Sequence, residues 1–430
     1  MSIGSTCRVG GVLALALLVP LSSAGRAKAQ QPEQGQRDDA LPSPLRLGHV
    51  LRFARSHRAE ITAARARARA AAERPAIVSS LDDPMVSPSL DHLPFQFHGA
   101  DYSLTIEQRF PLSGVRGNRG RAAQAEAQRL RAEIHRVGLD VELDAASAFL
   151  MLHERRQMTQ ILAQQLILAR QLVSAANARY ATGAGAQPDV LRAEVEVSRL
   201  EAAARSIRSE VRSAEAMLNT SLARPADTEV PPLESTIAAA VPAEWHDVRE
   251  MALRTRPELS AGRAEISRAE AEVTVMSSMY SPMAMVRTGP AYTMSDGPGW
   301  MLMVGISIPL WRDRLNSGVR EADAMADMTR ADLSAMTRMV EGEAATARYL
   351  VLASRDRFLA LRDDVVPRTR RIIEPSIAGY SSGTLPLVSV IDAAGTLWSV
   401  EAELISAELE LGLAWARLNR ATAANGGLRP

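Results

Sequence analysis

Seven methionines crowd one stretch of this sequence, and their thioethers are its densest group of potential metal ligands. Thioether sulfur is a soft ligand that suits Cu(I), which raises the hypothesis of a copper relay. The interpretation that we favour from the sequence is flexible surface, because an unbranched side chain adapts to irregular surroundings. The seven are Met276, Met279, Met283, Met285, Met294, Met301 and Met303.

Other reactive patterns are missing from the sequence. The seven histidines are scattered without a close pair of the kind that binds a structural metal. There is no GxSxG, no HExxH and no phosphate-binding glycine loop, and Gly183-x-Gly185 lacks the rest of that fingerprint. The single cysteine, Cys7, offers no disulfide. We therefore expect no enzyme, no cofactor and no metal site.

The N-terminus has the pattern of an export signal. Arg8 precedes an apolar run from Gly11 to Leu21, and Ala27-Lys28-Ala29 has the small-x-small form of a cleavage site. The run is about half of the ~20 residues that span a bilayer. We expect residues 1–29 to be a signal peptide and residues 30–44 a flexible lead. The formal net charge of +1 gives no reason to expect nucleic-acid binding.

The rest of the chain repeats at an offset near 200 residues, which suggests one body built from two similar halves. We predict a first repeat at 45–222, a linker at 223–244, a second repeat at 245–422 and a tail at 423–430. The landmarks of the first copy are Tyr180, Gly183, Val190, Ala193, Glu201, Glu210, Ala214, Leu218 and Asn219. They return as Tyr380, Gly383, Val390, Ala393, Glu401, Glu410, Ala414, Leu418 and Asn419.

Most of each copy reads as helix. Long segments from about Asn118 to Tyr180 and from about Ser317 to Tyr380 carry no obvious break except Pro367 and Pro375. The segments after them place apolar residues in alternating steps of three and four, which predicts coiled-coil helices with one buried stripe. Shorter helices are expected from Leu45 to Glu73, ended by Pro75, and from Trp245 to Met276. The four glutamates among the landmarks are expected on a solvated face.

Two stretches, Pro84 to Leu112 and Pro282 to Leu310, alternate apolar and polar residues with period two, which predicts two strands in each. We expect turns near Phe97 to Ala100 and Ser295 to Gly299. Four strands are too few to close a barrel, so strands of several chains would have to be combined. Gly183 and Gly383 suit helix reversals, with Pro188 at the start of the returning helix.

The order of these elements resembles the TolC-type outer-membrane efflux family over roughly residues 45–422. It runs short helix, strand pair, Phe-Pro-Leu or Ile-Pro-Leu, long helix, Tyr-x-x-Gly, returning helix and Leu-Asn, all twice. Three segments resemble the branch for cobalt-zinc-cadmium and copper efflux: Asp83-Pro84-Met85, Asp91-His92-Leu93-Pro94 and Gln108-Arg109-Phe110-Pro111-Leu112-Ser113-Gly114.

The resemblance implies a mainly α fold with a small β part. Three chains would share a 12-stranded transmembrane β-barrel and a periplasmic α-barrel tunnel built from long hairpins. It also implies a Gram-negative outer-membrane location in contact with lipid, and passive export of substrate. A periplasmic adaptor would dock at the hairpin tips, and an inner-membrane proton-driven transporter would supply the energy. The tips would include Tyr180, Gly183, Tyr380 and Gly383.

The resemblance further implies an acidic periplasmic entrance. Asp392 would form a ring of three carboxylates in a trimer, where like charges bind cations. Ser389 and Leu385 stand where the family usually has acidic and basic or polar residues, and Asp189 corresponds to Ser389 in the first copy. Two alternatives stay open: a duct for drugs or a secreted polypeptide, and a soluble periplasmic coiled-coil scaffold or adaptor.

Overall fold

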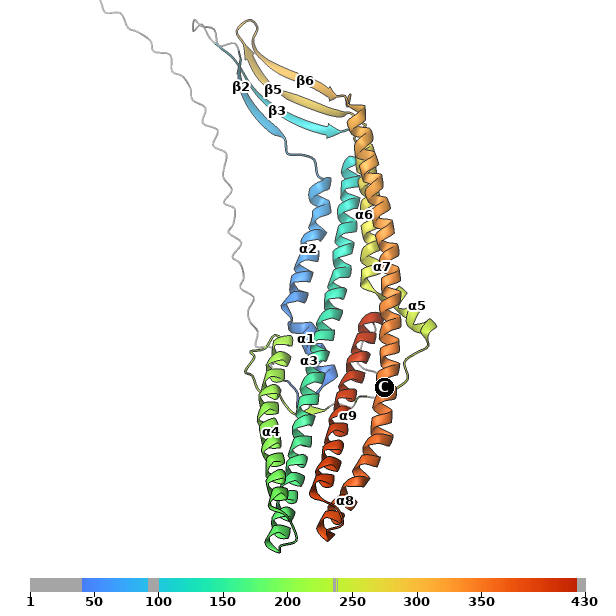
Figure 1. Cartoon of the computed structure of the whole chain (residues 1–430). Coiled ribbons are helices and arrows are strands. Elements are labelled where there is room, and N and C mark those ends of the chain that lie inside the picture. The colour runs from blue at the N-terminus through green and yellow to red at the C-terminus, as the bar shows by residue number, and fades with distance from the viewer. Residues whose placement is uncertain (1–40, 92–99, 235–236, 238, 424–430) are drawn as a thin grey trace, which may run out of the picture. The chain divides into compact units, whose positions relative to one another are not determined.

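The computed structural model describes residues 41–91, 100–234, 237 and 239–423, and these are mainly helical (Figure 1). The helices are α1 (Leu47–His57), α2 (Ala59–Ser79), α3 (Val115–Ala181), α4 (Gln187–Ser221), α5 (Trp245–Thr255), α6 (Pro257–Ser278), α7 (Arg312–Ala360), the π-helix η1 (Leu361–Val365), α8 (Val366–Ser382) and α9 (Leu387–Thr422). The strands are β1 (Leu45–Arg46), β2 (Met85–Asp91), β3 (Asp101–Pro111), β4 (Leu233–Glu234), β5 (Met283–Thr293) and β6 (Gly297–Ser307).

The four predicted strands form one antiparallel sheet in the order β2-β3-β5-β6. Of the predicted turn from Phe97 to Ala100, residues 97–99 lie outside the described part of the chain, and Ala100 is the first described residue after it. The second turn is shorter than expected, because β6 already begins at Gly297, whose φ of +75° suits a residue without Cβ. The short parallel pair of β1 and β4 was not predicted from the sequence.

The strand register places even-numbered side chains on one face of this sheet and odd-numbered side chains on the other. Val86 pairs with Ile106, Ile106 with Thr288, and Thr288 with Leu302, so even-numbered residues share one face. Apart from Gln108 and Thr288, that face consists of apolar residues, and most of its large side chains are exposed. The odd-numbered face carries Ser, Thr, Asp, Glu, Arg, Gly, Met, one Ala and one Pro. We call these the even face and the odd face.

The helices next to the sheet pack side by side in the same order as the strands to which they are connected. Beside the sheet, α2 contacts α3, α3 contacts α6, and α6 contacts α7. Farther from the sheet, α4 packs on α3, and α9 packs between α3 and the segment made of α7, η1 and α8 (Figure 1). Within the described residues, no helix is both long and apolar enough to cross a membrane.

The shorter helices differ from prediction in two ways. A single helix was expected from Leu45 to Glu73, but the chain breaks at Arg58, whose ψ of 126° is extended. Pro75 does not end α2, because the helix continues to Ser79 against α3, where Pro75 and Ser79 lie beside Gly120. Pro75 lacks one backbone N–H, and the contact with α3 overrides that local cost. The expected helix from Trp245 breaks likewise at Arg256, before Pro257.

The two long segments differ by a π-helical turn. In the first copy α3 is one helix of 67 residues, which extends about 100 Å at 1.5 Å per residue. In the second copy η1 interrupts the α-helix at Leu361–Val365, and neither Pro367 nor Pro375 ends α8. Pro111 and Pro309 are 198 residues apart, whereas Tyr180 and Tyr380 are 200 apart. The second segment thus holds two extra residues, and a π-turn can accommodate one of them without ending the helix.

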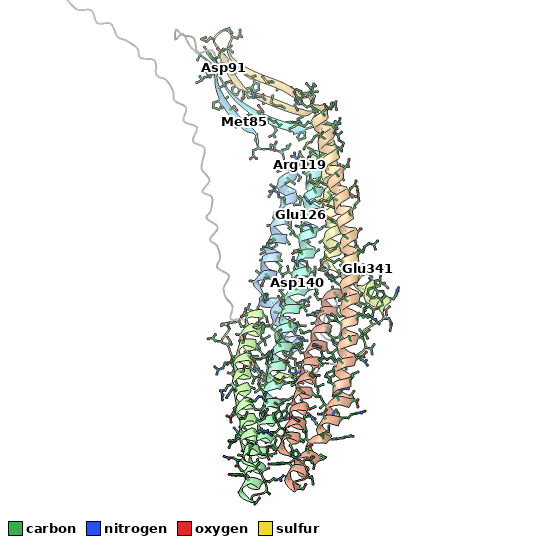
Figure 2. The ribbon with its side chains drawn as sticks, viewed as in Figure 1. Met85, Asp91, Arg119, Glu126, Asp140 and Glu341 are labelled. Atoms are coloured by element: carbon green, nitrogen blue, oxygen red, sulfur yellow. The ribbon has the colours of Figure 1, made fainter. Side chains whose placement is uncertain are left out.

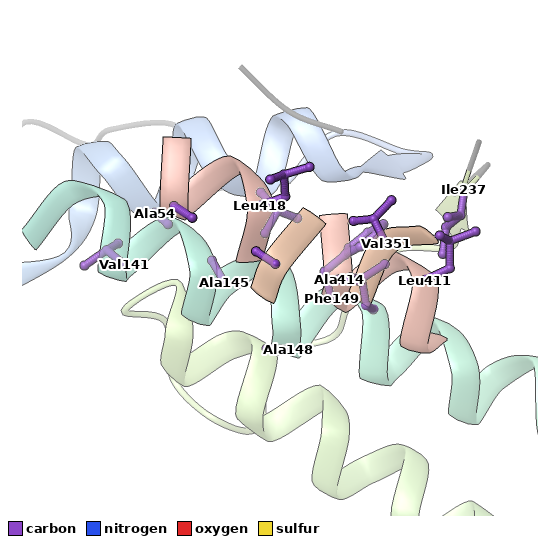
Figure 3. Close-up of a cluster of buried hydrophobic side chains, with 14 of the residues drawn as sticks. Ala54, Val141, Ala145, Ala148, Phe149, Ile237, Val351, Leu411, Ala414 and Leu418 are labelled. Carbon is purple, nitrogen blue, oxygen red and sulfur yellow. The ribbon is translucent and has the colours of Figure 1, made fainter. Parts of the chain in front are cut away.

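The main hydrophobic core lies midway along the helices, where most of the elements meet. Figure 3 shows Val141, Ala145, Ala148 and Phe149 of α3 near residues of α1, α7 and α9. The stripes predicted on α4 and α9 are buried or half-buried throughout. Gly412 is needed there, because a Cβ would meet Ile237 at 2.9 Å. The solvated face predicted for the landmark glutamates is wrong for Glu401, which is buried against Arg370.

Two similar junctions join helix ends at this level. In the first junction Arg58 bonds to Glu60 and donates to the Ser221 carbonyl at 3.1 Å. In the second, Arg256 bonds to Glu258 and donates to the Ala421 carbonyl at 3.4 Å. Each guanidinium therefore links the start of one helix to the last carbonyls of another, where positive charge is favourable.

Candidate functional site

The candidate site is the pair of helix reversals at the ends of α3 and α8, farthest along the chain from the sheet. Gly183 and Gly383 have φ values of +74° and +82°, which only glycine adopts without strain. In the first turn the N–H groups of Ala184 and Gly185 donate to the Arg179 carbonyl at 2.9 and 3.0 Å. In the second, those of Thr384 and Leu385 donate to the Gly379 carbonyl at 2.8 and 3.0 Å.

These turns share their backbone bonds but differ at the tyrosines. Tyr180 is 49% exposed, whereas Tyr380 is 2% exposed. Tyr380 packs with Leu172 and Ala176 of α3 and with Val190 of α4, so a residue of the second hairpin is buried against the first. The Tyr380 hydroxyl has no hydrogen-bond partner in the described part of the chain. The two hairpins therefore form one cluster at their tips.

Arg179 ties the hairpins together and was not recognised in the sequence. Its guanidinium lies 4.7 Å from the centre of the Tyr380 ring, donates to the Tyr380 carbonyl and donates to the Ala184 carbonyl at 3.0 Å. A Cβ at Gly383 would approach it to 3.2 Å. The signal in the sequence is a break in the repeat, because position 179 holds arginine where its equivalent, position 379, holds glycine.

Asp189 is the only predicted entrance residue that the structure connects to this cluster electrostatically. Burial raises the pKa of the Tyr380 phenol above its usual value, and the negative charge of Asp189 raises it further. The positive charge of Arg179 acts in the opposite direction. The phenol therefore stays neutral, and one cation and one carboxylate of the first hairpin flank it.

Within the described residues, no hydrogen bond or ion pair of the other predicted entrance residues joins the two hairpins. Asp392 is exposed on α9, and its carboxylate forms no ion pair within the described residues. Ser389 is half-buried in the first turn of α9, and its N–H donates to the Pro386 carbonyl at 3.1 Å. Leu385 lies over Gly379, where a Cβ would meet it at 2.7 Å, so its side chain packs within its own turn.

Ion pairs lie along the helices between the tips and the sheet. Arg170 pairs with Glu201 at 2.9 Å, and Arg370 pairs with Glu401 at 2.8 Å, 200 residues farther on. Nearer the sheet, an open cavity of about 560 Å³ between α3, α6 and α7 is lined by paired acidic and basic side chains. Figure 2 labels two acidic residues of α3, Glu126 beside this cavity and Asp140 at the second junction.

Among the described residues, no three His, Cys, Asp or Glu side chains are grouped to hold a metal ion.

Comparison with known proteins finds a family match for the second half of the chain. Residues 248–424 match the family described as outer membrane efflux protein. A relative of the wider chain is the outer membrane efflux protein BepC of Brucella suis biovar 1 (strain 1330), 24% identical over 286 residues. That match covers 65% of this chain and 62% of BepC, so the chain spans less than two thirds of the relative's length.

Solved structures extend the similarity to both halves. The outer-membrane channel OprN superposes with a TM-score of 0.76 at 20% identity, covering 89% of this chain and 91% of that one. CusC, described for its transmembrane channel formation, has a TM-score of 0.77 at 14% identity, covering 87% and 91%. At such identities the likeness shows the fold. The chain has the fold of outer-membrane channels, and the cobalt-zinc-cadmium and copper branch remains a prediction.

Proposed function

We propose that this protein is the outer-membrane exit duct of an efflux system, acting as a homotrimer. The observation that carries the proposal is the separation of the sheet into two faces. A soluble scaffold would have to leave the whole even face in water, including Leu302, Val304 and Ile306, each more than 60% exposed. Lipid is the environment that such a face suits.

The height of the even face matches a membrane. Exposed tryptophans lie near both ends of β6: Trp300, its fourth residue, is 71% exposed, and Trp311, four residues after the strand ends, is 74% exposed. Eleven residues of extended chain reach roughly 36 Å, or about 28 Å when strands tilt by about 40°. Tryptophan favours the two interfaces of a bilayer, and the apolar band of outer-membrane proteins is about 25 Å tall.

The open edges of the sheet support the trimer. β2 and β6 are edge strands, so each has a row of backbone groups without a partner in the sheet. An exposed apolar edge as long as β6 invites pairing with another chain. In the proposed trimer, β6 of one chain pairs with β2 of the next, and twelve strands close into one transmembrane barrel. The helices would then surround a periplasmic tunnel.

The proposed duct is passive. We assign docking of a periplasmic adaptor to the two turns, and the supply of energy to an inner-membrane proton-driven transporter. Heavy-metal cations are the proposed cargo, on the basis of the strand-end motifs such as Asp83-Pro84-Met85. The entrance ring is assigned to Asp392, which is exposed and free of ion pairs in the described residues. Ducts for drugs or polypeptides share the fold and differ in cargo.

The experiment that tests the proposal is extraction and sizing of the protein from membranes. We expect the full chain to require detergent, and light scattering of the complex to give three chains. A protein that leaves the cell envelope without detergent and remains monomeric would contradict both the membrane location and the trimer.

A further inference from the structure

The methionines of the strands all lie on one face of the sheet. Met85, Met283, Met285, Met301 and Met303 are odd-numbered, and the even face of the described strands holds none. Methionine is apolar, so a purely space-filling role would suit the even face at least as well. The flexible-surface interpretation favoured by the sequence does not explain this separation.

Met285 is a close neighbour of two of these methionines, Met283 and Met303. Met283 and Met285 are successive odd positions of β5, and Met303 is diagonal to Met285, because Met285 pairs with Gly305. Diagonal neighbours are about 7–8 Å apart, within reach of long side chains. The Met285 methyl group already lies over Gly305, where a Cβ would meet it at 3.0 Å. The absence of a side chain there lets the thioether extend toward β6.

The charges beside this patch do not favour hard cations. Glu107 is 3% exposed and lies between two arginines, Arg109 at 3.1 Å and Arg287, with a bond from Arg287 Nε at 3.0 Å. Two positive charges thus accompany one negative charge. Met85 of β2, labelled in Figure 2, and Met303 of β6 stand in the same row as Glu107 and Arg287. Next to these methionines, attraction of a cation must therefore come from sulfur ligation.

We propose that the odd face carries a binding site for soft monovalent cations, Cu(I) or Ag(I), in which Met285 and either Met283 or Met303 supply the sulfur ligands. The inference rests on the proposed function, in which the odd face lines the channel. Thioethers are soft ligands that select Cu(I) over Zn(II) and other harder ions. Three chains would place repeated weak sites around the outlet, and weak, multiple sites allow an ion to enter and leave.

The test is titration of the purified full-length complex with Ag(I), in chloride-free buffer, by isothermal calorimetry. The test variant carries Met283→Leu, Met285→Leu and Met303→Leu, which conserve volume and remove sulfur. The control carries Met217→Leu, Met251→Leu and Met339→Leu, three exposed methionines on separate helices. We expect the test variant to weaken Ag(I) binding at least tenfold, the control to match the wild type, and Zn(II) to distinguish none of the three.

The outcome that would overturn the proposed site and the controls for folding and pore formation are distinct. Equal Ag(I) affinity in wild type and test variant, or an equal loss in the control, would overturn the site. If the triple variant fails to fold by circular dichroism, Met285→Leu alone replaces it, with the same expected direction. Pore formation is recorded separately by conductance, so failure to form a pore would contradict the proposed function and leave the Ag(I) result interpretable.

Discussion

The two junctions make the same bond in different surroundings. Arg58 contacts Glu60 and one carbonyl, and its side chain remains 16% exposed. The Arg256 side chain is 1% exposed and also reaches Glu343 at 2.8 Å. The same arginine–glutamate contact therefore contributes differently to stability in the two copies, because the cost of losing a charge partner rises with burial.

The second junction belongs to a larger ion-pair network. Arg420 of α9 contacts Glu258, Glu343 and Asp140 at 3.0, 3.5 and 3.0 Å, so α3, α6, α7 and α9 are linked at one level. The equivalent of Arg420 in the first copy is Thr220, which lacks a charge. We expect the second junction to hold the helices together and the first to contribute little.

The largest expected effect is the loss of Arg256. Arg256→Ala removes a buried cation and leaves Glu258 with Arg420 as its remaining cation partner among the described residues, and we expect a destabilisation of about 3 kcal/mol. Arg58→Ala, the matched control, is expected to cost about 1 kcal/mol or less. Denaturant unfolding of the detergent-solubilised protein, followed by circular dichroism, measures both. Equal losses in the two variants would remove the proposed difference between the junctions.

At the tips, Arg179→Ala is the next largest change. It removes one charge-assisted hydrogen bond and one cation–π contact that join the hairpins, to the Tyr380 carbonyl and ring, and we expect a loss of about 2 kcal/mol of coupling. Such a loss shifts a closed–open equilibrium by roughly 30-fold, which single-channel recording would report as a higher open probability. Arg170→Ala, which breaks a pair within the first hairpin alone, is the control and should leave the open probability near that of wild type.

Acid should reduce the difference between the junctions. Burial raises the pKa of Glu258, but its hydrogen bond to Arg256 and the charges of Arg256 and Arg420 outweigh burial, so the pKa lies below its usual value. A lowered folded pKa contributes stability that is present above the unfolded pKa, near 4.5, and is lost as pH falls through the folded value. Glu258→Gln should therefore be less stable than wild type at pH 7 and approach it below about pH 4.

Unfolding midpoints across pH 3–7 give the measurement, with Glu60→Gln as the exposed counterpart. The hydrogen bond from Arg58 lowers the pKa of Glu60, so the direction is the same. We expect its effect to be smaller, because solvent screens that pair. A gap between wild type and Glu258→Gln that stays constant with pH would show that the carboxylate charge contributes nothing.

The smallest expected effect concerns the entrance. Asp392→Ala removes an exposed carboxylate that forms no ion pair with any residue the structure describes, so we expect unchanged stability, with a modest rise in conductance or weaker block by divalent cations. Asp189→Asn, beside Tyr380, should change block less and instead lower the pKa of the Tyr380 phenol. Recordings with and without divalent cations test both. Identical block in wild type and Asp392→Ala would refute the entrance assignment.

Periodic patterns made much of the fold predictable. The four strands followed from period-two alternation, and the buried stripes of α4 and α9 followed from steps of three and four. The breaks at Arg58 and Arg256 were missed because tertiary junctions place them. Pro75 was misread because packing on α3 overrides a local helix-breaking tendency. The offset between the copies changes from 198 to 200 residues. The π-turn at Leu361–Val365 could have been predicted only by interpreting this change as inserted residues.

The tip site was less predictable than the fold. Both glycine turns could be placed from Tyr-x-x-Gly, because backbone geometry dictates glycine. The role of Arg179 could not be placed in this way, because its partner in the second hairpin, Tyr380, is about 200 residues away. Nor could the opposite burial of Tyr180 and Tyr380 be inferred from identical residues, since it depends on which hairpin covers which.

The central claim is that the chain forms an outer-membrane duct, and single-channel recording in planar bilayers tests it most directly. Purified protein should insert without a partner and give discrete conductance steps, which divalent cations block from the side of the hairpin tips. Folded, detergent-solubilised trimer that never conducts, even with Arg179→Ala to release the tips, would contradict the duct.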